Sequence, residues 1–115
     1  MLKDKEDKVT LVEVGPRDGL QNEPVNVPTD VKIELVKRLA AAGLTHIEAT
    51  AFVSPKWVPQ MADSVEVMST CATAPELSHV ILSALAPNMK GFDAAMLTGS
   101  LLLGLSMQLL IDPKM

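Results

Sequence analysis

The sequence predicts an α/β fold made of three consecutive βα units with parallel strands. Three short apolar runs have the composition of buried strands, and they cover residues 9–14, 45–52 and 79–86. Each run is followed by a predicted helix. The first helix covers residues 29–42 and the second about 61–72; residues 87–96 are predicted as a loop that enters the third. Because strands that alternate with helices are joined by right-handed crossovers, one parallel sheet is expected.

The first predicted strand, VTLVEV at residues 9–14, is short and rich in β-branched side chains. Gly15 and Pro16 end it, since proline has no N–H to donate to a strand ladder. Residues 19–28 contain two prolines and are typical of a loop. The first βα unit therefore turns sharply after Val14.

The first predicted helix begins with Thr29 or Asp30 as its cap and ends near Ala42, where Gly43 suits a left-handed C-terminal position. Its apolar positions recur at helical spacing: Val31, Leu35, Leu39 and Ala42. Its solvent side is expected to carry Lys32, Glu34, Lys37 and Arg38. The helix is therefore predicted to be amphipathic.

The second predicted strand, THIEATAF at residues 45–52, alternates between two kinds of side chain. Period two places Ile47, Ala49 and Ala51 on one face. The same period places His46, Glu48 and Thr50 on the other face. Glu48 is therefore expected among polar neighbours near the carboxyl end of a strand.

Composition and charge exclude several classes of function. The 115 residues suffice for one domain, with 48% hydrophobic and 21% charged residues, a globular balance. A net charge of −4, a pI near 5.0 and few aromatic residues argue against a nucleic-acid partner. The single cysteine, Cys71, excludes an internal disulfide and suits a reducing compartment. Without a secretory or transit pattern at the amino terminus, a cytoplasmic location is expected.

The segment 94–111 contains no charged residue over eighteen positions, which is the lower limit for a membrane span. Glycine, serine, threonine and glutamine dilute its apolar character, and neither a basic flank nor an aromatic belt orients it. A membrane association is therefore an unfavoured alternative, and the run is foremost a solubility concern.

Charged residues lie where two of the predicted strands end. Arg17 and Asp18 follow the first strand and Glu48 lies near the end of the second, the edge at which parallel sheets bind ligands. Asp18 offers a hard oxygen ligand for Mg²⁺ or Mn²⁺, and Arg17 can stabilise negative charge developing on oxygen. Glu48 can accept a proton or hold Arg17. On spacing alone, a turn with a solvated ion pair remains the favoured alternative.

Three stretches of the chain resemble the hydroxymethylglutaryl-CoA lyase family. They are VEVGPRDGLQNE at 12–23, IEATAFVSPKWVPQMAD at 47–63 and APNMKGFDAA at 86–95. The resemblance runs from about Val9 to Met96 and covers the amino-terminal third of that family. Isopropylmalate and homocitrate synthases share the first motif and are an alternative, but FVSPKWVPQM at 52–61 favours the lyase.

The resemblance implies a partial TIM (β/α)8 barrel and a role for each matching residue. Asp18 would be a ligand of the divalent cation, Arg17 would bind substrate and stabilise the enolate of the acetyl-CoA leaving group, and Glu48 would support Arg17 in catalysis. Gln21 belongs to the same motif with a less defined role. The implied reaction cleaves 3-hydroxy-3-methylglutaryl-CoA to acetoacetate and acetyl-CoA, in leucine breakdown and ketone-body formation.

The resemblance is incomplete in ways that affect activity. The family completes its metal site with a His-x-His pair and an asparagine, and donates a proton from a cysteine in a glycine-rich loop; none of these is found here. A whole barrel needs roughly 250 residues. We therefore expect a truncated chain that is inactive alone, with residues 1–96 as the barrel part and 97–115 as a divergent hydrophobic tail. A non-catalytic isoform that associates with other subunits, or forms a homo-oligomer through its exposed sheet edges, is the alternative.

Overall fold

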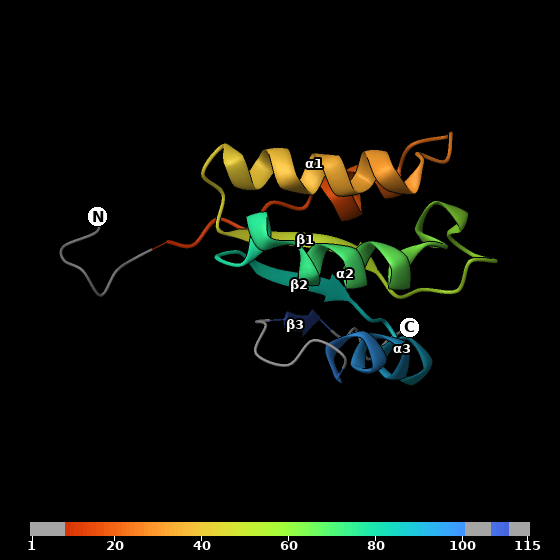
Figure 1. Cartoon of the computed structure of the whole chain (residues 1–115). Helices are drawn as coiled ribbons and strands as arrows, with labels where there is room; N and C mark the ends of the chain where they lie inside the picture. Colours follow the sequence, from red (N-terminus) through yellow and green to blue (C-terminus); the bar gives the residue numbers. More distant parts are fainter. Residues whose placement is uncertain (1–8, 101–106, 111–115) are drawn as a thin grey trace.

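The computed structural model describes residues 9–100 and 107–110, which form a three-stranded parallel sheet flanked by helices (Figure 1). The sheet order is β1-β2-β3, with β1 at His46–Ala51, β2 at Ile81–Leu85 and β3 at Met107–Leu110. The helices are α1 at Thr29–Ala41, α2 at Ser64–Thr73 and α3 at Met89–Ser100. Three short turns complete the chain order: η1 at Gly15–Gly19, η2 at Pro59–Met61 and η3 at Pro75–Leu77. The predicted α/β class with parallel strands is confirmed.

The helices pack against the sheet and against one another in chain order. Helix α1 packs on β1 and on α2, α2 packs on β1, and α3 lies beside α2 and β3 (Figure 1). The core joins these layers through apolar side chains, chiefly Val36, Ala40, Ile47, Ala49, Val67, Met68, Cys71, Leu82, Ala84 and Ala95. The carboxyl ends of β1 and β2 consequently point toward the same edge.

The prediction of a buried strand at residues 9–14 is wrong. Only Glu13 pairs with the sheet, as an isolated parallel bridge to Ile47. Val9, Leu11 and Val12 are exposed. Beyond Glu13 the ladder cannot continue, because the carbonyl of Val14 accepts from the N–H groups of the η1 turn. The first βα unit is thus a bridge, a turn and α1.

Helix α1 exists where the sequence predicts it, but its buried face is shifted by one position. Lys32, Val36 and Ala40 form the buried stripe, while Val31 is 50% exposed. Lys32 is thereby buried instead of solvated, because it finds polar partners beneath the helix. Neither Thr29 nor Asp30 is the cap: the N-cap position is Pro28 and has no side-chain cap. Gly43 has the expected positive φ, 108°.

Strand β1 departs from strict alternation directly after Glu48. Its pairing with β2 advances from Glu48–Ser83 to Thr50–Ala84, so one extra residue, Ala49, is inserted as a bulge. Five of its six residues are buried, so both of its faces are covered. The prediction of two faces, one apolar and one polar, is therefore correct only up to Glu48. Bulges of this kind re-aim side chains near functional sites.

The charge-free run at 94–111 is divided between two elements in the described part of the chain. It contributes the last turns of α3, and Met107–Leu110 form β3, which pairs in parallel with β2. The sequence predicts no strand there; positions 101–106 and 111–115, also part of the predicted tail, lie outside the described residues. Among the helices described, none has the length and apolar character to cross a membrane.

Candidate functional site

The site begins with a tight turn that the local sequence imposes. The carbonyl of Val14 accepts hydrogen bonds from the N–H groups of Arg17 at 3.1 Å, Asp18 at 2.7 Å and Gly19 at 3.3 Å. Pro16 fits the first turn because its missing N–H would have no partner there. Arg17 and Asp18 therefore occupy one compact turn, η1.

Backbone pairing brings this turn against β1. The N–H of Glu13 donates to the carbonyl of His46 at 2.9 Å, and the N–H of Glu48 donates to the carbonyl of Glu13 at 2.8 Å. The side chain of Glu13 also accepts from the N–H of Gly15 at 2.9 Å. Glu13 thus anchors the turn, a contribution that sequence reasoning missed; its only signal is a lone carboxylate at the end of an apolar run.

Arg17 and Glu48 meet as a buried ion pair. The Nε atom of Arg17 donates to Oε1 of Glu48, whose side chain is only 2% exposed. The Arg17 side chain is 18% exposed, so it is not fully closed off from solvent. Removing this carboxylate from water is tolerable because a charged donor satisfies it. The two residues are 31 positions apart in the chain and are brought together by the Glu13 bridge.

Asp18 lies on the open side of the same guanidinium. Its Oδ1 is 3.5 Å from Nη1 of Arg17, and its side chain is 55% exposed. Asn22 steadies the turn by donating from Nδ2 to the carbonyl oxygen of Asp18 at 2.8 Å. Arg17 is therefore flanked by a buried carboxylate on one side and a solvent-facing carboxylate on the other.

Gln21 is partly buried at the end of the turn, and its Oε1 is buried. In the part of the chain that the structure describes, this oxygen has no hydrogen-bond partner. A buried acceptor without a donor is uncommon in folded proteins. This observation gives Gln21 a definite property that the sequence motif alone does not provide.

The residues in place fit one ligand position of a divalent cation. The exposed carboxylate of Asp18 is a hard oxygen donor, as Mg²⁺ and Mn²⁺ prefer, whereas Glu48 is committed to Arg17. Among the residues described, no group of three His, Cys, Asp or Glu side chains is arranged so that it could hold a metal ion. Within the described residues, Asp18 would therefore supply one ligand of such a site and not a complete set.

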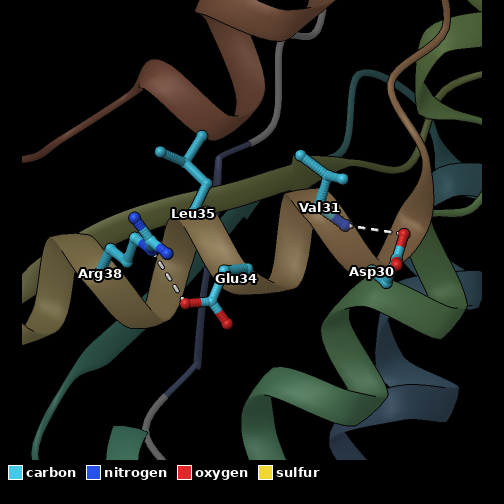
Figure 2. A pocket seen from close by; sticks show the side chains of 5 residues that line it. All are labelled: Asp30, Val31, Glu34, Leu35 and Arg38. Carbon is cyan, nitrogen blue, oxygen red and sulfur yellow. Dashed lines mark hydrogen bonds and ion pairs between the residues drawn. The ribbon is translucent and has the colours of Figure 1, made fainter.

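A separate hollow of about 590 Å³ lies on α1 and has a different character (Figure 2). It is lined by Asp30, Val31, Glu34, Leu35 and Arg38. Figure 2 shows Arg38 and Glu34 turned toward each other, with Nε and Oε2 3.0 Å apart. Both of these side chains are mostly exposed, so we assign this hollow no part in the chemistry.

The fold and the site define the class of this protein: an α/β protein with a parallel sheet, in which Arg17 of the η1 turn pairs with Glu48, the third residue of β1. The HMGL-like family matches residues 8–104, and the chain belongs to this family. The predicted family and the partial TIM-barrel fold are thereby confirmed. Members of this family generally depend on a divalent metal.

Relatives and solved structures agree with this assignment. The chain is 56% identical over 93 residues to the mitochondrial hydroxymethylglutaryl-CoA lyase of Gallus gallus, covering 81% of this chain and 30% of the relative. It is 53% identical over 92 residues to a cytoplasmic 3-hydroxy-3-methylglutaryl-CoA lyase of Mus musculus, covering 80% of this chain and 26% of the relative.

Among solved structures, the hydroxymethylglutaryl-CoA lyase of Pseudomonas aeruginosa matches with a TM-score of 0.72 and 58% identity, covering 80% of this chain and 30% of that one. An HMG-CoA lyase of Acinetobacter baumannii, solved in complex with coenzyme A and 3-methylmalate, matches with a TM-score of 0.74 and 40% identity, covering 85% and 31%. The chain thus spans about 30% of the length of these structures.

Proposed function

We propose that this chain carries the oxyanion-stabilising part of a hydroxymethylglutaryl-CoA lyase site. The reaction cleaves 3-hydroxy-3-methylglutaryl-CoA to acetoacetate and acetyl-CoA, and its place would be leucine breakdown and ketone-body formation. The observation that carries this proposal is the Arg17 guanidinium, held between Asp18 and Glu48 of β1. The 58% identity to the Pseudomonas aeruginosa lyase over the matched region supports it.

Arg17 binds the substrate and stabilises the charge that develops when the carbon–carbon bond breaks. Cleavage leaves the electron pair on the acetyl-CoA fragment as an enolate, whose oxygen needs a fixed donor. Nε of Arg17 is engaged by Glu48 and Nη1 lies near Asp18; within the described residues Nη2 has no partner. A guanidinium held in this way meets the oxyanion without reorganising.

Asp18 is the proposed ligand of the divalent cation, Mg²⁺ or Mn²⁺. Its exposure and its hard oxygens support this role. Such a cation supplies Lewis-acid polarisation of substrate oxygen atoms when bound. Gln21 is the proposed partner of a ligand at the same site, because its buried Oε1 lacks a donor among the described residues.

Glu48 is catalytic in this proposal through the guanidinium that it orients. Its carboxylate fixes Nε of Arg17, and the bulge at Ala49 sets the direction of the strand just beyond it. An acyl-CoA thioester is the proposed substrate class, as one related structure contains coenzyme A. We propose the cytoplasm as the compartment, since Cys71 is a buried free thiol and cytoplasmic relatives are among those matched.

A non-catalytic role in association with other subunits is the second candidate. It is favoured by one observation: the described residues contain no group of three His, Cys, Asp or Glu side chains that could hold a metal ion. The division into residues 1–96 and a divergent tail at 97–115 stays a prediction. With the 115-residue chain alone, we expect no acetoacetate from hydroxymethylglutaryl-CoA and Mg²⁺, because most of the metal shell must come from elsewhere.

A chimeric enzyme tests the proposed function. Residues 9–100 of this chain replace the aligned segment of the Gallus gallus lyase, and acetoacetate formation is measured with Mg²⁺ present. The chimera is expected to be active, and Asp18→Ala is expected to abolish the activity. Arg38→Ala is the matched control, since Arg38 is an exposed cation on α1 away from the site. A folded chimera without activity, or an Asp18→Ala chimera with full activity, would overturn the proposal.

A further inference from the structure

A polar network that the site description does not use joins α1 to the segment before α2; Thr29 and Lys32 belong to α1, and Lys32 is its buried member. Lys32 is 4% exposed, and its Nζ donates to Oδ1 of Asp63 at 2.6 Å and to the main-chain oxygen of Gln60. Thr29 donates from Oγ1 to the other carboxylate oxygen of Asp63 at 2.6 Å. We call this network, Thr29, Lys32, Gln60 and Asp63, the rim latch.

The rim latch connects two loops that follow the two halves of the site. The loop at 52–63 leaves β1, which carries Glu48, and it ends in Asp63 at the start of α2. The loop at 20–28 leaves η1, which carries Arg17, and it enters α1. Gln60 spans the gap between them, because its Nε2 donates to the main-chain oxygen of Glu23 at 2.8 Å.

We propose that Lys32 is a positioning residue whose buried ammonium holds the loop at 52–63 against α1 and the loop at 20–28. The inference rests on the proposed function only for its catalytic consequence, which is a fixed position of the two loops that follow Glu48 and Arg17. The latch itself follows from the contacts. A buried Lys–Asp pair adds little net stability compared with an apolar pair, but it fixes geometry through directed hydrogen bonds.

Nearby contacts support a loop that is held from below. Met61 is buried, and its sulfur lies 3.7 Å from Oγ1 of Thr50 in β1. At its outer end the loop is exposed, with Lys56 and Trp57 at its surface. The outer end therefore depends on the latch and on Met61 for its position. Loss of the Lys32 ammonium removes the donor of the Gln60 carbonyl and leaves Asp63 without its cation.

Limited proteolysis of the 115-residue chain tests the latch. Trypsin cleaves after Lys56 only when the loop opens, and mass spectrometry separates this cleavage from cleavage at other sites. Lys32→Met is expected to accelerate cleavage after Lys56 about tenfold relative to cleavage after Arg38. The fluorescence anisotropy of Trp57, the only tryptophan, is expected to fall in the same variant.

Lys37→Met is the matched control, because Lys37 lies on the same helix and pairs at 3.2 Å with the exposed Glu76 instead of the loop. It is expected to leave both measurements unchanged. Thr29→Val removes one hydroxyl of the latch, and it is expected to accelerate cleavage after Lys56 less than Lys32→Met does. It serves as the test variant if circular dichroism shows that Lys32→Met does not fold. Cleavage after Lys56 that is not accelerated in the folded variants, or equal acceleration at all sites, would overturn the inference. Neither outcome bears on acetoacetate formation by the chimera.

Discussion

At the scale of single residues, the burial of Glu48 is the strongest constraint on the site. A carboxylate with 2% of its side chain exposed requires a charged donor, and the described structure gives it Arg17. The same contact leaves the guanidinium in one orientation, with Asp18 on its open side. Stability and proposed catalysis therefore depend on the same pair of atoms.

Glu48→Ala is expected to lower the free energy of unfolding by about 3 kcal/mol, because it removes the buried partner of a largely buried cation and leaves only the exposed Asp18 beside it. Urea unfolding of the 115-residue chain measures this change. Glu34→Ala is the matched control, since Glu34 pairs with Arg38 at the surface and should change stability by about 0.5 kcal/mol or less. Equal losses for the two variants would contradict a buried, satisfied Glu48.

Cys71 gives a prediction about pH. Burial raises the pKa of its thiol from 9.0 to about 11, although Lys37 acts in the opposite direction. The unfolded thiol ionises first as the pH rises, so the stability that this group contributes is complete below pH 9 and is lost toward pH 11. The loss amounts to about 2–3 kcal/mol.

The measurement for Cys71 is urea unfolding at several alkaline pH values. The parent chain should lose more stability between pH 9 and pH 11 than Cys71→Ala, which has no thiol to ionise. Parallel pH curves for the two proteins would show that the folded thiol ionises normally. Slow reaction of Cys71 with thiol reagents in the folded chain is expected from the same burial.

At the scale of elements, α3 is seated by a glycine that permits close approach. A Cβ atom at Gly91 would lie 2.1 Å from the main-chain oxygen of Phe52, too near for any side chain. In the first turn of α3, the N–H of Gly91 also donates a hydrogen bond to Oδ1 of Asn88 at 2.9 Å. Helix α3 therefore begins where the end of β1 leaves room for it.

Gly91→Ala is expected to destabilise the chain by about 1–3 kcal/mol, since backbone must move to remove the overlap and this outweighs the better helix propensity of alanine. The melting temperature, followed by circular dichroism, measures the effect. Gly19→Ala is the control, because no atom lies within 4 Å of its added Cβ. A Gly91→Ala chain as stable as the Gly19→Ala chain would contradict this packing.

The elements also show what the sequence can predict. Apolar composition located β1 and β2, and helical spacing located α1 and α2 within a few residues. Which face of α1 is buried was not predictable, because Lys32 is buried by polar partners that come from the loop after β1. The isolated bridge at Glu13 and the strand β3 were likewise decided by tertiary pairing with neighbouring strands.

The site was predictable as a set of residues but not as a geometry. Strand-end placement and the motif selected Arg17, Asp18, Gln21 and Glu48. The structure adds that Glu48 is buried against Nε of Arg17, that Asp18 faces solvent, and that Glu13 anchors the turn. These relations depend on the register of the Glu13 bridge, which local sequence does not encode.

At the scale of the whole molecule, the sheet edge next to β1 is poorly protected in the described part of the chain. Only Glu13 pairs there, and Val9 and Leu11 before it are each 72% exposed. Apolar side chains beside an open edge favour association. We therefore expect concentration-dependent self-association of the 115-residue chain, measured by sedimentation velocity.

Placing lysine at both positions, Val9→Lys with Leu11→Lys, is expected to reduce this association, because charged edge residues oppose strand pairing. Val25→Lys is the control, since Val25 is 71% exposed in a loop away from that edge. Association that is unaffected by the double substitution, or equally reduced by Val25→Lys, would place the contact elsewhere.

The central claim is that Arg17 stabilises the enolate oxygen and that Asp18 binds the divalent cation. The kcat and the Mg²⁺ dependence of the chimeric lyase test this claim most directly. Arg17→Gln is expected to lower kcat about a hundredfold to a thousandfold at an unchanged Mg²⁺ requirement, as loss of an oxyanion donor does. Asp18→Asn is expected to raise the Mg²⁺ concentration needed for half-maximal activity at least about tenfold. Unchanged kcat with Arg17→Gln, together with an unchanged Mg²⁺ requirement with Asp18→Asn, would contradict the account.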